Sequence, residues 1–354
     1  MKLLFTKDAD WLKRWDDYVQ NEDKGSHLML SDWTRSYLSY GFDYEFCIAE
    51  ENGKIIGGFA AVIAKAMILR FYIVPYGPIA SKGFENHLDD FISAVPERAK
   101  DISCCYCHIT IPNCKFENQH VFNRLPDFAA LKGAKPEHLF SYVYSSNGLN
   151  WIDLQNFDEE SKIMTLKPAV RRNIRNSYRK GLEFKIMDTH QSIADGYKLF
   201  GENAAEAKYN IRQWTDIRDS LYGLQSKSLM KMLGAYKDNV LKGAILLLKA
   251  GNYYTYILGG SKKEVPDLRT GDFLQWEAIK LSLAEGLDGY NISLGGSKGV
   301  VEFKNSFNTQ SLLFENNRYH WILNKTQFSF YQFAEKQIKP YKKKISQLLS
   351  ILKK

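Results

Sequence analysis

Long apolar runs are missing from this sequence. The longest, such as Gly57–Ala64 and Ala244–Leu248, fall well short of the roughly 20 residues that a membrane-spanning helix needs. The opening segment, MKLLFTKDAD, carries charges at Lys7, Asp8 and Asp10 that interrupt the apolar stretch a secretory signal would require. The sequence therefore predicts neither a membrane span nor export, and we expect the protein to lie in the cytoplasm.

Motifs of the common metal and nucleophile chemistries are also missing. The five cysteines are an odd count, and Cys104, Cys105 and Cys107 share one apolar stretch without the spacing of a metal site. The seven histidines are scattered, and a histidine within an apolar strand, such as His108, is more often a packed core residue than a ligand. No P-loop, dinucleotide-binding, nucleophile-elbow or zinc-protease pattern occurs. We predict reduced core thiols and no metal.

The composition indicates a globular protein with more than one domain. The chain has 354 residues, of which 45% are hydrophobic, 14% aromatic and 25% charged, enough for a large interior and an ordinary solvated surface. Lys and Arg outnumber Asp and Glu by 48 to 40, which gives a net charge of +8. This modest excess favours anionic partners such as nucleotides, phosphates, RNA or a membrane face.

One order of elements occurs twice along the chain. The first copy has strand-like runs at 45–49 and 54–64, a strand at 67–74, a helix at 85–100 and a strand at 103–111. The second copy has the same elements at 231–236, 240–249, 253–258, 272–285 and 290–294. The repeat predicts two related α/β (α+β) domains with mixed sheets flanked by helices. We place them in residues 1–150 and 151–327, followed by a basic C-terminal helix in residues 328–354.

The most basic segment is Ser161–Lys185, where eight lysines and arginines face Glu183 alone, for a net charge of +7. Pro168 and Gly181 bracket a helix there. Its arginines are Arg171, Arg172, Arg175 and Arg179. The spacing of four places three of them on one stripe, which suits bidentate contacts to phosphates and hence to RNA. A solvated basic face without a ligand is an equal alternative.

A glycine-rich turn, Gly295–Gly299, follows the second copy's last strand. Backbone amides of such a turn can bind an oxyanion or a phosphate, with a lysine beside it, although most glycine-rich turns only reverse the chain. Phe303 and Lys304 follow after the three residues Val300–Glu302.

Several segments together resemble the Fem family, the peptidoglycan-bridge aminoacyltransferases. The most specific is 299–308, GVVEFKNSFN, which is similar to the Gly-Val-x-x-Phe-Lys stretch that closes the family's second domain. Other similar segments occur in the family's order: Tyr76–Ile79, the Arg171–Arg175 helix, Leu258–Ser261 and Leu274–Ile279. The resemblance spans about residues 30–335 and implies two tandem GNAT-like acyltransferase domains, in agreement with the internal repeat.

The resemblance also implies an activity. Members of the family transfer an amino acid from aminoacyl-tRNA to an amine of a peptidoglycan precursor, so aminoacyl-tRNA and a nucleotide- or lipid-linked precursor are the expected partners, without a cofactor. By resemblance, Lys304 stabilises the oxyanion that forms when the amine attacks the ester, and Phe303 shapes the site beside it. A fixed cation aimed at developing negative charge contributes about 3–4 kcal/mol.

The resemblance implies an arginine and a nearby tyrosine that bind the precursor early in the second domain. The residues that fit are Arg212, Arg218 and Tyr222, and the last two lie one helical turn apart. In the first domain, Arg35 follows Trp33 at a place where the family often has a tryptophan followed by a basic residue.

Two tyrosines, Tyr254 and Tyr256, fit a family position at which a tyrosine lines the substrate channel. A cross-strand aromatic ladder explains them equally well. Thr110 departs from the family, because it stands where an acid that orients or deprotonates the amine is common.

The alternative function is an acyl-CoA-dependent GNAT-type N-acyltransferase that acts on a sugar or lipid-linked intermediate of the cell envelope, with acetyl-CoA or another acyl-CoA as donor. The usual GNAT pyrophosphate loop is missing, and Arg269–Asp272 has the wrong spacing for it. A helix N-terminus of another sequence can still bind pyrophosphate. A third hypothesis, an RNA-binding protein without catalysis, rests on the basic helix alone.

The tail Lys336–Lys354 carries seven lysines and no acid, interleaved with leucines and isoleucines. Such a segment can form an amphipathic helix on an anionic membrane, which would make the protein peripheral to the inner membrane face. We prefer the alternative, a terminal helix that packs on the first domain and exposes its lysines.

Overall fold

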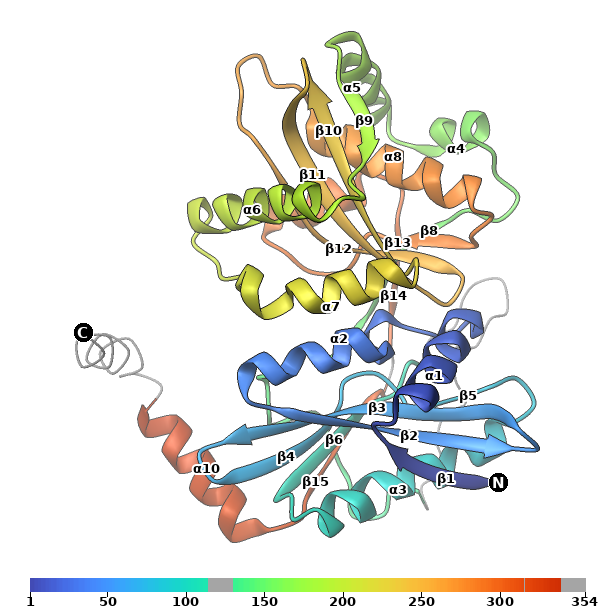
Figure 1. The fold of residues 1–354 in the computed structure, drawn as a ribbon, viewed down its shortest axis with the longest axis vertical. Helices are drawn as coiled ribbons and strands as arrows, with labels where there is room; N and C mark the ends of the chain where they lie inside the picture. Colours follow the sequence, from blue (N-terminus) through green and yellow to red (C-terminus); the bar gives the residue numbers. More distant parts are fainter. Residues whose placement is uncertain (114–129, 315, 339–354) are drawn as a thin grey trace.

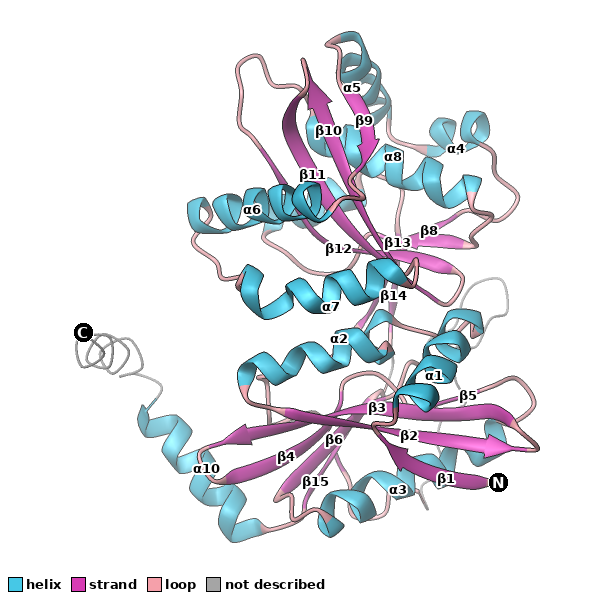
Figure 2. Cartoon of the chain, viewed as in Figure 1, coloured by secondary structure: helices cyan, strands magenta, loops and turns pink. Residues whose placement is uncertain are grey.

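The computed structural model describes residues 1–113, 130–314 and 316–338. Two mixed β-sheets, each flanked by helices, form the two halves of the molecule in Figure 1. Figure 2 shows the same arrangement by secondary structure, with helices on both faces of each sheet. The predicted α/β class with two mixed sheets is confirmed.

The first sheet contains mostly N-terminal strands. Its order is β1 (Lys2–Thr6), β2 (Asp43–Glu51), β3 (Lys54–Ala66), β4 (Leu69–Val74), β6 (Tyr106–Thr110), β15 (Arg318–Ile322) and β7 (Lys135–Pro136), and β5 (Ile79–Ala80) pairs with β3. The β2–β3 turn uses Asn52 and Gly53, both with positive φ, the backbone that a tight hairpin requires. Strand β4 runs parallel to β6, with the intervening helix covering one face.

The second sheet repeats this arrangement. Its order is β14 (Gln310–Leu313), β8 (Gly148–Asp153), β13 (Gly289–Asn291), β12 (Tyr253–Ser261), β11 (Val240–Ala250), β10 (Met230–Lys237) and β9 (Glu183–Ile186). As in the first sheet, an antiparallel meander is followed by a helix and a parallel strand, here β13 beside β12. The predicted internal repeat is therefore present.

Helices cover both sheets. On the first domain they are α1 (Ala9–Asn21), α2 (Ser31–Arg35), α3 (Leu88–Asp101) and α10 (Lys325–Ile338), with short 3₁₀ turns at His27–Met29, Ser36–Tyr40 and Glu85–His87. On the second they are α4 (Glu159–Thr165), α5 (Pro168–Arg179), α6 (His190–Glu206), α7 (Trp214–Ser226), α8 (Thr270–Ala284) and α9 (Lys298–Asn305). Helices α2 and α7 face one another where the two domains meet (Figure 1).

The domain boundaries differ from the prediction at the C-terminal side. Residues 151–327 were expected to form the second domain, but β15 pairs with β6 in the first sheet. Trp321 of β15 lies in the same buried cluster as Cys107 and Ile109, which gives the physical reason: β6 would otherwise present an unpaired edge. An apolar strand pattern predicts a strand but not the sheet that it joins.

Helix α10 packs on the first domain, as the sequence predicted for the start of the tail. Phe328 stacks on Tyr106 with ring centroids 4.8 Å apart, and Tyr331 lies 4.8 Å from Phe71. Residues 339–354 of the expected helix lie outside the described residues.

The cysteines that the structure describes, Cys47, Cys104, Cys105 and Cys107, are buried and free, as expected of core thiols. Among the described residues, no group of His, Cys, Asp and Glu has the geometry to hold a metal ion. Within the same part of the chain, every helix is too short or too polar to cross a bilayer.

Candidate active site

Lys304 lies in the last turn of α9, directly after the glycine-rich turn. Gly295 and Gly296 adopt positive φ values of 85° and 125°, so the chain reverses sharply between β13 and α9. The reversal brings Lys304 back onto the turn: its Nζ donates to the carbonyl oxygens of Ser293 (3.2 Å) and Gly295 (3.0 Å) and to the Ser293 hydroxyl (3.1 Å). The turn therefore presents oxygen acceptors to a lysine, instead of the amide cradle that its glycines suggested.

The Lys304 side chain is almost fully buried, at 6% exposure. Burial lowers the pKa of its ammonium to about 8, so the cation still predominates at neutral pH. Its Nζ also lies 5.5 Å from the ring centroid of Tyr256, a cation–π distance. Burial raises the pKa of Tyr256 to about 12, which keeps that hydroxyl neutral. The pair forms a fixed positive charge beside a neutral phenol.

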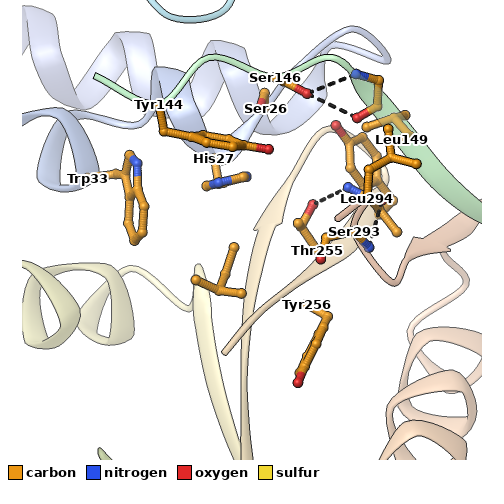
Figure 3. Close-up of a pocket in the computed structure, with 14 residues that line it drawn as sticks. Ser26, His27, Trp33, Tyr144, Ser146, Leu149, Thr255, Tyr256, Ser293 and Leu294 are labelled. Carbon is orange, nitrogen blue, oxygen red and sulfur yellow. Dashed lines mark hydrogen bonds between the residues drawn. The ribbon is translucent and has the colours of Figure 1, made fainter. Parts of the chain in front are cut away.

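A cavity of about 260 Å³ lies next to this pair. Its walls come from three parts of the chain, as Figure 3 shows: the segment before α2, the connection into β8, and the β12–β13 region of the second sheet. The lining residues include His27, Trp33, Tyr144, Tyr256, Asn291 and Ser293. Lys304 does not line the cavity itself, but Ser293, which holds it, and Tyr256, over which it lies, both do.

Asn291 fixes the floor of the cavity. Its Oδ1 accepts hydrogen bonds from the backbone amides of Asn150 and Ser293, each at 3.0 Å, and its Nδ2 donates to the Thr255 hydroxyl at 3.4 Å. These bonds join the ends of three strands, β8, β12 and β13, to the turn that anchors Lys304. Ser293 itself has a positive φ of 60°, a strained backbone for a serine that persists where surrounding contacts enforce it.

His27 is the titratable group on the first-domain side of the cavity. Its ring packs edge-on against Trp33, with centroids 5.2 Å apart. Burial lowers the pKa of His27 to about 3, so the imidazole is neutral at physiological pH and can accept a hydrogen bond. In Figure 3 the ring lies below Tyr144, within the cavity.

Two of the predicted substrate-binding arginines lie in or against residues 33–40 of the first domain, at the domain interface. Arg212 lies over the rings of Tyr37, Trp33 and Tyr40, at 4.5, 5.2 and 5.3 Å, and donates to the Ser36 hydroxyl. Arg35, on the same segment, is half exposed and pairs with Asp32 at 2.6 Å. Neither arginine lines the cavity, but Trp33 does, so Arg212 lies close to its first-domain wall.

Three other predicted residues are not brought to the cavity. Arg218 is exposed on α7 and pairs with Asp219 at 2.9 Å. Tyr222 stacks on His190, with centroids 3.8 Å apart. Tyr254 is fully buried beneath α8, where its hydroxyl donates to the Glu285 carboxylate at 2.9 Å. Tyr254 and Tyr256 are in regular register with β11, opposite Lys249 and Leu247, and so share one face of β12. Only their place along the strand separates them, which the sequence could not distinguish.

The predicted basic helix is α5. Its buried face, Val170 and Ile174, belongs to the core cluster that also contains Phe273 of α8, and the helix begins at Pro168 as expected. Three of its arginines, Arg172, Arg175 and Arg179, are exposed, and Arg171 is half buried beside Met164. The stripe is thus open to solvent on the second domain, separate from the cavity walls.

Phe303 points to the start of α8. Its ring packs edge-on against Phe307, with centroids 5.4 Å apart, and reaches within 3.4 Å of the position that a Cβ on Gly271 would occupy. Phe303 therefore wedges α9 against the α8 N-terminus and holds the helix that carries Lys304.

Thr110, the departure from the family, lies buried on β6 in the first sheet. Its hydroxyl is 3.3 Å from Nε2 of His138, which also lies 2.7 Å from the Ile109 carbonyl oxygen. His138 stacks on His108 with centroids 3.7 Å apart. Burial lowers the pKa of His138 to about 4. This position therefore carries a neutral imidazole next to the threonine instead of a carboxylate.

No sequence pattern pointed to His27 or Tyr144, which reach the cavity only because the two domains pack together. Asn291 and Ser293 had a detectable context, since both lie in the strand predicted at 290–294, directly before the glycine pair.

Comparison with known protein families and structures agrees with this geometry. Residues 168–305 match the acetyltransferase (GNAT) domain family. That range includes α5, α8 and Lys304, and it supports the expected transferase class. No curated protein matches the sequence.

Solved structures extend the likeness to the whole chain. The fold is similar to that of FemX, with a TM-score of 0.75 at 13% identity over 93% of this chain and 99% of that one. It is also similar to L-PGS from Bacillus licheniformis, with a TM-score of 0.55 at 11% identity over 94% and 96%. The C-terminal domain of a candidate lysylphosphatidylglycerol synthetase from Agrobacterium fabrum gives 0.56 at 13% over 93% and 97%. The predicted Fem-like tandem GNAT-type fold is confirmed.

Proposed function

We propose that this GNAT-type protein is an aminoacyltransferase that moves an amino acid from aminoacyl-tRNA to an amine of a peptidoglycan precursor. The observation that carries the proposal is the buried Lys304 ammonium, held by Ser293 and Tyr256 at the wall of a cavity between the two domains. The residues at the cavity provide neither a nucleophilic cysteine nor a metal site among those described. Direct attack of the amine on the ester fits such a site.

The role of Lys304 in this reaction is electrostatic. Its three N–H donors are occupied by two carbonyl oxygens and one hydroxyl. The Ser293 hydroxyl is the acceptor that can rotate away, because it is on the side chain of a residue that lines the cavity. An oxyanion formed on the ester carbon would take its place, and a buried cation stabilises such charge by about 3–4 kcal/mol.

His27, on the first-domain wall of the cavity, is the residue that we propose to accept the proton of the attacking amine. His27 lines the cavity and is neutral at physiological pH because burial lowers its pKa to about 3. The negative charge of the tetrahedral oxyanion would raise the tendency of the imidazole to hold a proton relative to the empty site. The carboxylate expected at position 110 is replaced by Thr110 and so cannot serve.

The acyl-CoA alternative keeps the fold and changes the donor. It is favoured by the match of residues 168–305 to acetyltransferase domains. The start of α8, where a pyrophosphate would bind by analogy with other helix N-termini, argues against it. Asp272 lies in the first helical turn there, buried against Asn173, and Arg269 is paired with Asp267 at 3.2 Å. A carboxylate in the first turn competes with an incoming anion for the helix dipole.

The test is transfer of label from a pool of charged, radiolabelled tRNAs to extracted peptidoglycan precursors, beside labelled acetyl-CoA. We expect label to move from tRNA and the rate to fall ~10²- to 10³-fold in Lys304→Met. The matched control is Lys298→Met, an exposed lysine at the other end of α9, which should transfer at the wild-type rate. Transfer from acetyl-CoA alone would establish the alternative.

A further inference from the structure

Large apolar side chains project into solvent from two elements of the first domain that are distant in sequence. Met67 and Ile68 form the tip of the β3–β4 hairpin and are 56% and 90% exposed. Phe330 and Phe333, on α10, are 53% and 64% exposed. Single exposed residues of this kind are ordinary, but a contiguous group marks a surface with a partner.

The two elements lie side by side. Tyr331 of α10 packs on Phe71 of β4, and both belong to one buried cluster with Leu69, the residue after the hairpin tip. In Figure 1 the β3–β4 turn and α10 meet at the left end of the first domain. Because Tyr331 faces the sheet, Phe330 and Phe333 lie on other faces of the helix and point outward. Met67, Ile68, Phe330 and Phe333 are here called the apolar edge.

Basic residues border the apolar edge. Lys65 and Arg70 are cross-strand partners directly behind the hairpin tip, and Lys325 and Lys336 are exposed near the two ends of α10. The acid of α10, Glu335, accepts a hydrogen bond from the Tyr142 hydroxyl at 2.9 Å. Beyond α10 the sequence adds six further lysines and no acid. The four described cations around the edge therefore outnumber the acid of α10, although the whole protein is only moderately basic.

We infer that the apolar edge binds the surface of an anionic lipid bilayer. Apolar side chains on a protruding turn and helix enter the boundary between headgroups and acyl chains, while lysines around them contact the lipid phosphates. A second copy of this chain fits the same surface less well, because the two basic rims would face each other and repel. Charge complementarity thus selects the membrane over self-association.

Packing of the tail on the first domain and contact of the tail with a membrane are compatible in this structure. A docked helix and a membrane contact seemed to exclude each other in the sequence, whereas α10 docks through Phe328 and Tyr331 and still presents Phe330 and Phe333. The hairpin tip, which no sequence pattern singled out, completes the surface.

The experiment is co-sedimentation of the full-length protein with vesicles of phosphatidylcholine alone and of phosphatidylcholine mixed with phosphatidylglycerol. We expect binding to the anionic vesicles that weakens with salt, and little binding to the neutral ones. Ile68→Asp and Phe333→Asp should each lower the apparent affinity of the protein for the anionic vesicles by about tenfold. Each variant removes an apolar side chain that the membrane would bury in the bound state. Both positions are exposed, so the variants should fold.

The matched control is Val265→Asp, which adds the same charge at a fully exposed apolar residue of the second domain, in the loop between β12 and α8. It should bind as the wild type does. Equal binding by all four proteins, or no binding by wild type to either vesicle, would overturn the inference. Concentration-dependent dimers in light scattering that Ile68→Asp and Phe333→Asp abolish would assign the edge to self-association instead. The readout needs no reaction, so a failed transfer assay leaves it standing.

Discussion

The Lys304 ammonium lies over the Tyr256 ring, with Nζ 5.5 Å from the ring centroid. The two residues come from α9 and β12, and the turn at Ser293 holds them together at the cavity wall. A cation–π contact of this partly desolvated kind contributes about 1–2 kcal/mol. The geometry therefore assigns a separate and measurable role to the aromatic ring.

Replacing that ring should slow transfer. In Tyr256→Leu we expect the rate to fall by about tenfold, because the cation loses its aromatic neighbour. Tyr256→Phe keeps the ring and should remain within about twofold of wild type. The measurement is the single-turnover rate of label transfer. Equal losses in both variants would assign the effect to the hydroxyl and contradict a cation–π role.

Transfer should also depend on the protonation of Lys304. Burial lowers the pKa of this group to about 8, so the ammonium is present below that pH and is lost as pH rises through it. We expect the rate to decline above a pH of about 8 and the decline to move to higher pH in Lys304→Arg, since a guanidinium stays charged. A pH–rate profile of both proteins tests this. A decline at the same pH in both would place the titrating group elsewhere.

Lys227 should be the main ionic link between the domains. Its Nζ lies 2.8 Å from the Asp16 carboxylate and 2.7 Å from that of Asp32, both of which are buried. Lys227→Met leaves these charges without their partner and should lower the free energy of unfolding by about 3 kcal/mol. Urea unfolding at neutral pH measures the loss.

The same deficit should shrink in acid. Burial raises the pKa of Asp16 even beside Lys227, and loss of the lysine raises it further. A folded-state pKa above the unfolded value means that the protonated form folds better, so the penalty is full at neutral pH and falls as pH drops toward the range in which Asp16 protonates. A deficit that stays constant down to pH 4 would show that packing, not charge, accounts for it.

Two helical glycines should respond to alanine in opposite directions. A Cβ on Gly223 of α7 would lie 2.7 Å from the Asp32 carboxylate across the domain interface, whereas one on Gly201 of α6 would meet no atom within 4 Å. Gly201→Ala should stabilise by about 0.5–1 kcal/mol through helix propensity. Gly223→Ala should destabilise, because the domains must separate to admit the methyl group. Thermal unfolding of both variants measures the contrast, and a stabilising Gly223→Ala would contradict the close packing.

Much of the fold could be predicted from periodicity, because strands and turns leave their patterns within short stretches of the sequence. The β3 and β11 runs are apolar over their length, and the turn at Asn52–Gly53 specifies its own backbone, so the repeated meander was visible in the sequence. The assignment of β15 to the first sheet depends on contacts with β6, about 200 residues away in the chain. Pairing at that distance leaves no local pattern.

The candidate site also contains some residues that could be predicted from the sequence and others that could not. Lys304 and Phe303 stand in a specific motif, and Tyr256 precedes a glycine pair, so each could be proposed from the sequence. His27 and Tyr144 reach the cavity only through domain packing. Tyr254 and Tyr256 share a face of β12, and only their place along the strand brings one of them to the cavity. The roles of these residues stay predictions until the variants are measured.

The crossing of β15 back into the first sheet has a consequence for synthesis. During translation the first 150 residues emerge with one long edge of their sheet unpaired, and the strand that covers it appears only after almost the entire second half has been made. Expressed alone, residues 1–150 would keep β6 as an open, apolar edge, which is a template for aggregation. The two halves are therefore expected to mature as one unit, and a split-gene version should assemble only if the 318–338 segment is moved onto the N-terminal fragment.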